Sequence, residues 1–136
     1  MRKPCTYDYA VIRVVPRVER EEFVNVGVIL SCPALDDLLE ARIELDAARI
    51  HALDPTLDLD DLARHLDAIP RICRGGDDAG PIGRLPPRER FRWLTAVRST
   101  VIQSSPVHTG RCDEAAVTID ALMDRMVRVV PRRSAG

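Results

Sequence analysis

Polar side chains that could bind an anion gather in two segments of this chain, residues 13–25 and residues 90–108. Guanidinium forks, hydroxyl groups and amides are the ordinary ligands of phosphate and carboxylate groups in proteins. The candidate binding residues are Arg13, Arg17, Asn25, Arg90, Arg98, Ser99, Gln103, Ser104 and His108. Because none of them has an obvious structural task in the sequence pattern, together they predict a binding face for an anion.

Catalysis at the same face is the alternative hypothesis. A nucleophilic site would need a serine of segment 99–104 or Cys112 beside His108, together with an orienting acid. The sequence has no G-x-S-x-G elbow or comparable frame around these residues. A metal site at His108 and Cys112 would need two further ligands, which the sequence does not offer nearby. We therefore assign no catalytic residue, expect no metal and no cofactor, and prefer a binding role.

A glycine- and proline-rich segment, residues 74–88, lies just before Arg90. Its spacing matches neither G-x-x-x-x-G-K-[ST] nor G-x-G-x-x-G, the two common phosphate-binding patterns, and it contains no lysine. The segment is therefore predicted to be an irregular loop. Loops this rich in glycine expose backbone N–H groups, so it is a second candidate for contacting an anion.

The first half of the candidate face depends on a β-hairpin, predicted over residues 7–30. Apolar residues recur with a period of two on both sides of a short charged link, as is typical of strands. One face of the second strand would carry Val24, Val26, Val28 and Leu30. Matching the core faces of the two strands pairs Ile12 with Val28 and places Arg13 opposite Gly27. Since glycine inside a strand marks a bulge or a close backbone approach, Arg13 is predicted to lie beside such a place.

The remaining elements follow from apolar periodicity and from capping residues. A third strand is favoured over a helix because two strands alone are marginally stable. A short helix capped by Asp46 and a longer acidic helix follow, and Pro70 ends or kinks the acidic helix. The second half is predicted as a short helix with Pro87 at its first position, a strand and a final helix. The predicted ranges are, in chain order, 38–45, 47–53, 59–69, 87–94, 98–104 and 113–130.

These elements predict a single α+β domain over residues 1–136, with an ordered core at about 5–131 and a disordered C-terminal tail. Its small, mainly antiparallel sheet is expected to be centred on the N-terminal hairpin. The two longer helices are expected to pack together on one face of that sheet, the face that carries the valine row.

The composition excludes several classes of protein. No apolar run approaches the roughly 20 residues that span a membrane, and the N-terminus lacks a signal-type segment, so a cytoplasmic location is expected. The formal net charge of −1 provides no overall field that would attract nucleic acid. The four cysteines form no C-x-x-C pair and are expected to be reduced, mostly buried thiols.

Five blocks of the sequence carry a resemblance to a known family. They are YDYAVIRVVPRVEREEFVNVGVIL, LEARIELDAARIHAL, CRGGDDAGPIGRL, ERFRWL and RSTVIQSSPVHTGRC. Together they resemble the bacterial family catalogued as domain of unknown function 3037, over roughly residues 7–127. The chain departs from the family pattern at Pro70, where a helix-compatible residue is usual, and at Val97, where proline is common. The resemblance implies no activity, but it implies a partner protein, a HipA-like kinase encoded nearby.

The sequence therefore favours a non-catalytic binding or accessory module. Its Arg/Ser/His face would recognise a partner protein or a phosphate-bearing ligand, and no membrane partner is expected. The alternative is a small enzyme that acts on a phosphorylated or nucleic-acid substrate at the same face.

Overall fold

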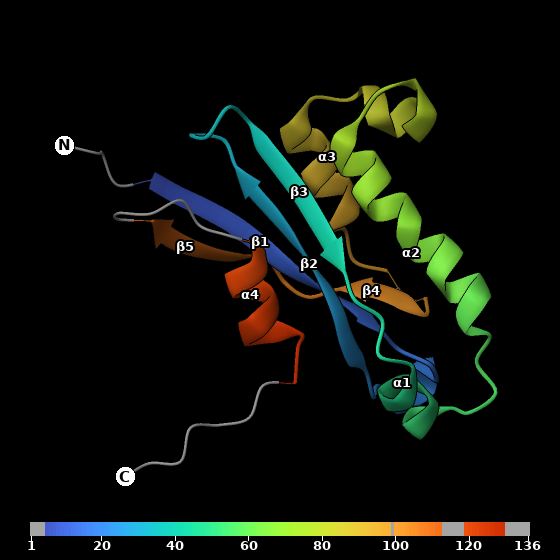
Figure 1. Cartoon of the computed structure of the whole chain (residues 1–136). Coiled ribbons are helices and arrows are strands. Elements are labelled where there is room, and N and C mark those ends of the chain that lie inside the picture. Colours follow the sequence, from blue (N-terminus) through green and yellow to red (C-terminus); the bar gives the residue numbers. More distant parts are fainter. Residues whose placement is uncertain (1–4, 99, 113–118, 130–136) are drawn as a thin grey trace, which may run out of the picture.

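A five-stranded, mainly antiparallel sheet forms the centre of the protein (Figure 1). The computed structural model describes residues 5–98, 100–112 and 119–129. The strands are β1 (Cys5–Val14), β2 (Val24–Cys32), β3 (Leu38–Ile43), β4 (Ile102–Ser104) and β5 (His108–Cys112). Their order is β3-β2-β1-β4, and β5 also pairs with β1. The predicted α+β class and the central position of the hairpin are confirmed.

Helices cover both faces of the sheet. They are α1 (Ala47–Leu53), α2 (Leu59–Arg74), α3 (Pro87–Leu94) and α4 (Ile119–Met126). The first three pack on one face and α4 packs on the other (Figure 1). The expectation that both longer helices share one face is thereby corrected. The physical reason is that β2 is buried at every position except the half-buried Asn25, and a strand that is apolar on both sides needs a cover on each.

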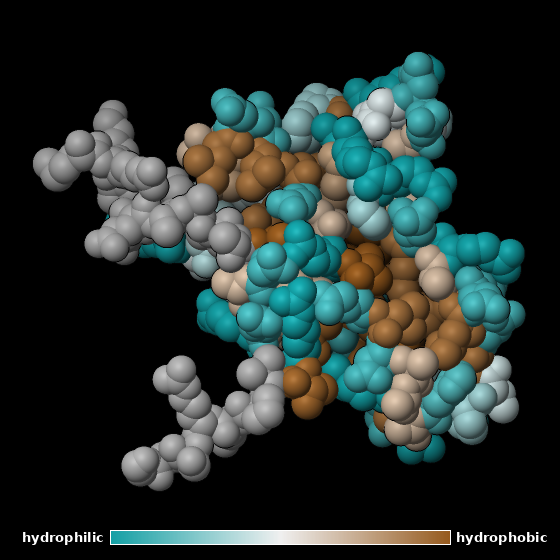
Figure 2. Space-filling model, in the orientation of Figure 1, coloured by the Kyte–Doolittle hydropathy of each residue, from teal (hydrophilic) through white to brown (hydrophobic). Residues whose placement is uncertain are grey.

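Two apolar clusters correspond to these two faces. Ile12, Val14 and Leu66 belong to the cluster under α1, α2 and α3. Tyr9 and Met123 belong to the cluster under α4. Figure 2 shows that apolar side chains also reach the surface between the strands and α2, where every residue of β3 is only half-buried. The sheet is therefore less completely covered on the side of β3 than at its centre.

A β-bulge sets the register of the hairpin. Ile12 lies opposite Gly27, but Arg13 lies opposite Asn25, so Val26 is left without a partner in β1. The predicted pairing of Ile12 with Val28 is therefore wrong by one residue. Because the extra residue reverses the alternation, Val24 and Val26 face the first cluster, whereas Val28 and Leu30 face the second.

The helices begin where the sequence predicted. Asp46 caps α1 and Asp58 caps α2, each by accepting a hydrogen bond from a backbone N–H in the first turn. Pro87 occupies the first turn of α3. The acidic helix does not end at Pro70 but continues to Arg74, because Ile72 and Cys73 keep its apolar phase and are buried. No helix within the described ranges is long and apolar enough to cross a membrane.

The C-terminal part of the sheet differs from the prediction. The strand expected at 98–104 begins only at Ile102, and a further strand, β5, begins at His108. Both strands run along the same edge of β1, and Ser105 joins them. Its N–H donates to the carbonyl of Val11 and its hydroxyl accepts from the N–H of Val11, both at 2.8 Å. The following Pro106 has no N–H to continue this pairing, so one edge strand is divided into two.

A polar cluster at the surface ties α3 to the sheet. Asp8 accepts hydrogen bonds from Arg88 at 2.6 Å and from Thr109 at 2.7 Å, and Arg88 also donates to Ser31 at 3.2 Å. Burial opposes ionisation of Asp8, but the hydrogen bonds from Thr109 and Arg88, with the charge of Arg88, outweigh it. They hold the pKa of the Asp8 carboxyl below its usual value.

This cluster predicts an acid-sensitive contribution to stability. Asp8→Asn should lower the free energy of unfolding at pH 7 by about 1 kcal/mol, because it removes hydrogen bonds to a charged group that is partly screened by solvent. Because folding lowers the pKa of Asp8, the extra stability of wild type over Asp8→Asn is fully present above the unfolded-state pKa of about 3.9. It is lost as the pH falls through the lower pKa of the folded state. Urea unfolding between pH 7 and pH 3 measures the difference, and the exposed Asp36→Asn should show none. A difference that persists unchanged at pH 3 would contradict the assignment.

Candidate functional site

Arg13 forms the centre of the candidate site. It lies on the α4 face of β1, with Asn25 of β2 and Gln103 of β4 directly opposite on either side. Its guanidinium carbon lies 4.0 Å from the ring centroid of Phe23, a cation–π contact. Its Nε is buried and has no hydrogen-bond partner. Burial also lowers the pKa of the Arg13 guanidinium, so the folded protein holds this charge at a desolvation cost.

A second arginine, Arg98, reaches the same place from the end of α3. Its guanidinium carbon lies 4.5 Å from the ring centroid of Trp93. Its two terminal nitrogens donate to the carbonyls of Trp93 at 2.7 Å and Leu94 at 3.3 Å. These bonds satisfy orphan carbonyls at the helix C-terminus, where a positive charge is favourable. Arg98 therefore has a structural task that also fixes its position in the site.

Arg13 and Arg98 line one pocket of about 450 Å³, which we call the Arg13 pocket. Its other lining residues are Val15, Val18, Glu21, Phe23 and Gln103. Two guanidinium groups and one carboxylate give it a formal charge of +1. Within the described residues, no carboxylate forms an ion pair with either arginine. The pocket therefore offers uncompensated positive charge beside an amide and an aromatic ring, which suits a carboxylate or phosphate group.

Three other predicted residues are held elsewhere. Arg17 points toward α1, where its Nε lies 3.9 Å from a carboxylate oxygen of Asp54. Asn25 donates to the carbonyl of Met126 at 3.0 Å and so ties β2 to the end of α4, while its Oδ1 is buried without a partner. Arg90 is buried, and its side chain donates to backbone carbonyls at the end of α2.

The remaining predicted residues do not line the Arg13 pocket either. Ser104 donates its hydroxyl to the carbonyl of Ser105 at 2.8 Å. His108 lies in β5 opposite Tyr9, and the two ring centroids are 5.3 Å apart. Arg13 lies four positions along β1 from Tyr9, a distance of about 13 Å along a strand. Ser99 lies outside the described residues. The structure thus brings together Arg13, Arg98 and Gln103 from the predicted set.

The glycine-rich loop uses its backbone amides internally. The N–H groups of Gly76, Ala79, Gly80, Gly83 and Leu85 each donate to a carbonyl of the same loop. Gly75 donates instead to the carbonyls of Arg71 and Ile72 and so ends α2. The expectation that this loop presents free amides to an anion is therefore corrected at these positions, because two short 3-10 turns consume them.

The described titratable groups add no evidence for catalysis. Burial raises the pKa of the Cys73 thiol to about 12, which leaves it protonated and a poor nucleophile at neutral pH. Among the described residues, no group of three or more His, Cys, Asp or Glu side chains is placed to hold a metal ion. Among the described residues, the Nε of Arg13 and the Oδ1 of Asn25 are the buried side-chain atoms left without a hydrogen-bond partner.

Sequence reasoning missed the aromatic partners of the two arginines. The predicted register places Phe23 near Arg17 at the hairpin end, and the large apolar surface of Trp93 predicts packing in the core or at the edge of the domain. Phe23 is instead 44% exposed and Trp93 is 41% exposed, and each stacks on a guanidinium group. The available signal was that each arginine has aromatic residues within ten positions of it in the sequence, but a spacing of that kind does not fix which of them makes the contact.

Comparison with known proteins identifies a family but no activity. The family model described as "Protein of unknown function (DUF3037)" matches residues 9–127. No curated protein and no solved structure matches the chain.

Proposed function

The chain belongs to the DUF3037 family of proteins of unknown function, and we propose that it is a non-catalytic binding module whose Arg13 pocket recognises an anionic group. The observation that carries this proposal is the buried Nε of Arg13, which has no partner in the folded protein. A buried, unpaired guanidinium nitrogen is costly, and such cost is typical of sites kept for binding. The ligand class is a carboxylate or phosphate, carried by a small molecule or by a partner protein.

The surroundings of the pocket support a macromolecular partner as the carrier of that group. Val18, Phe23 and Trp93 are 37–44% exposed, and Val97, beside Arg98, is 99% exposed. Aromatic residues and arginine are enriched in protein interfaces, where they make the largest contributions to affinity. Arginine stacked on an aromatic ring is also held in a defined orientation before the ligand arrives, which reduces the entropy lost on binding.

The first test uses phosphate as a probe and Arg13→Met as the variant. Titration of wild-type protein with inorganic phosphate should produce a saturable shift of the Arg13 Nε–H signal in a 15N NMR spectrum. Arg13→Met should weaken the affinity, followed through the backbone amide of Gln103, by about tenfold or more. The loss of one charge-assisted hydrogen bond weakens binding by a factor of about that size. Equal, non-saturating shifts at all exposed arginines would overturn the proposal.

Stability provides the matched control for that experiment. Because Arg13 is desolvated and its Nε is unpaired, Arg13→Met should unfold with a free energy within about 0.5 kcal/mol of wild type, or higher. The exposed Arg92→Met on α3 should change neither phosphate affinity nor stability. A large loss of stability in Arg13→Met would instead mean that Arg13 serves the fold.

A further inference from the structure

Strand β4 leaves one edge of the sheet open. Val101 and Ser105 direct backbone groups toward β1, where the Val101 carbonyl accepts from Val15 at 2.6 Å and the Ser105 N–H donates to Val11 at 2.8 Å. Backbone groups alternate along a strand, so those of Ile102 and Ser104 point away from β1. No other described strand pairs with β4 on that side. The Ile102 carbonyl already accepts a hydrogen bond from the Thr100 hydroxyl at 2.8 Å. The N–H of Ile102 and both backbone groups of Ser104 remain for a further strand to bind.

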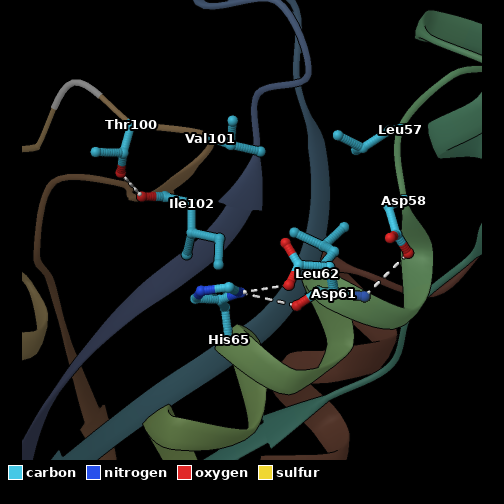
Figure 3. A pocket seen from close by; sticks show the side chains of 8 residues that line it. All are labelled: Leu57, Asp58, Asp61, Leu62, His65, Thr100, Val101 and Ile102. Carbon is cyan, nitrogen blue, oxygen red and sulfur yellow. Dashed lines mark hydrogen bonds and ion pairs between the residues drawn. The ribbon is translucent and has the colours of Figure 1, made fainter.

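An apolar groove runs beside this open edge, on the α2 side of the sheet. It has a volume of about 450 Å³ and lies between β4 and the first turns of α2. Figure 3 shows the side chains of Leu57, Leu62, Val101 and Ile102 arranged around an open space. This groove lies on the opposite face of the sheet from Gln103 and the Arg13 pocket, because Ile102 and Gln103 are consecutive residues of one strand.

The rim of the groove is acidic. Asp58 and Asp61 both line it, and Asp61 already forms ion pairs with Arg64 at 3.2 Å and His65 at 3.7 Å. Asp58 accepts a hydrogen bond from the N–H of Asp61 at 3.1 Å (Figure 3). Among the described ion pairs none involves Asp58, so one carboxylate at the rim is left for a positive charge from outside.

We propose that an extended segment of a partner protein adds to β4 as a new edge strand, with an aliphatic side chain in the groove and a Lys or Arg beside Asp58. Main-chain hydrogen bonds to Ile102 and Ser104 supply affinity, and alternate side chains supply specificity, the usual division in strand addition. Because β4 has three residues and is followed by Pro106, the paired stretch is short. This inference stands on residues other than those of the Arg13 pocket.

The chemistry of β4 disfavours a second copy of this chain as the occupant. The stretch from Thr100 to the end of β4 carries two apolar residues, Val101 and Ile102, and both already line the groove of their own chain. The same stretch has no basic residue for Asp58. A partner segment with an aliphatic and a basic residue two positions apart places both side chains on the groove face of the added strand, and so satisfies both the apolar space and the carboxylate.

The probe is a capped peptide of sequence Thr-Lys-Thr-Val-Thr-Lys-Thr with a fluorescent label, measured by fluorescence anisotropy; its valine and lysines lie on one face of an extended strand. Saturable binding with a Kd below about 1 mM is expected. The same peptide N-methylated at alternate backbone nitrogens, and a peptide with the valine replaced by glutamate, should each bind at least tenfold more weakly. If no peptide saturates, or if the N-methylated peptide binds as well as the parent, strand addition is overturned.

Two variants of the protein complete the test. Ser104→Pro removes an N–H that points away from β1, so it should leave the sheet intact while weakening peptide binding at least tenfold. Asp58→Asn keeps the helix cap but removes the charge, and should weaken binding severalfold while leaving helix content unchanged. Phosphate binding at Arg13 should be unaffected in both, which separates this inference from the proposed function. A wild-type dimer that Ser104→Pro dissociates would identify a second copy as the occupant and overturn the proposal.

Discussion

Replacing Arg90 by methionine should lower the free energy of unfolding by about 3–5 kcal/mol. Arg90 is only 9% exposed. Its Nη1 donates to the carbonyls of Ile72 at 2.8 Å and Cys73 at 2.7 Å, and its Nε donates to the carbonyl of Leu85 at 2.9 Å. Methionine would fill similar space but would leave three carbonyls without these donors.

The position of Arg90 explains why its charge is tolerated in the interior. The carbonyls of Ile72 and Cys73 belong to the last turn of α2, where the helix dipole is negative and backbone acceptors have no partner within the helix. Arg90 thus caps α2 from the neighbouring helix α3 and fastens the glycine-rich loop through the carbonyl of Leu85. The Arg90 side chain therefore connects α2, α3 and the glycine-rich loop, and replacing it is expected to destabilise all three.

Urea unfolding followed by circular dichroism measures the effect, with Arg92→Met as the control on the exposed side of the same helix. The control should stay within about 0.5 kcal/mol of wild type. The loss of unfolding free energy in Arg90→Lys should lie between those of Arg90→Met and Arg92→Met. One ammonium group cannot reach both the Ile72 and the Leu85 carbonyls, as a guanidinium fork does. A loss below about 1 kcal/mol for Arg90→Met would contradict the capping role.

Arg90 also illustrates what local sequence patterns can and cannot predict. The starts of α1, α2 and α3 were predictable because Asp46, Asp58 and Pro87 act within their own turns. The burial of Arg90 depends instead on α3 packing against the end of α2, a contact between elements. An arginine on a short helix therefore looked like a ligand residue in the sequence, although the fold uses it as a cap.

The candidate site was predictable only in part, for the same reason. Arg13 and Gln103 meet because β1 pairs with β4, which the predicted strands made plausible but did not fix. Phe23 covers Arg13 only because the hairpin connection folds back and the bulge at Val26 shifts the register. The alternation of Val24, Val26, Val28 and Leu30 gives no sign of that bulge, since the sequence keeps a period of two through it. The glycine that follows was the one local signal.

Gly27→Ala should lower the free energy of unfolding by about 2–4 kcal/mol. A Cβ at this position would lie 2.5 Å from the carbonyl oxygen of Arg42 and 2.7 Å from Cδ1 of Ile43, both in β3. In an ordinary strand the same substitution would be favourable, because glycine loses more conformational entropy on folding than alanine does. The expected sign is therefore reversed by the close approach of β3 to β2.

The double variant Gly27→Ala with Ile43→Val separates the two contacts. Removing Cδ1 relieves the side-chain clash but not the closer one with the backbone oxygen of Arg42, so stability should be recovered only in part. Thermal and urea unfolding of both single variants and of the double variant measure the coupling. Full recovery of stability would mean that β3 can move away from β2, so that the contact with the backbone oxygen of Arg42 is relieved at little cost. A stabilised Gly27→Ala would mean that the glycine serves neither the bulge nor the approach of β3, and that the register placing Arg13 opposite Asn25 has another cause.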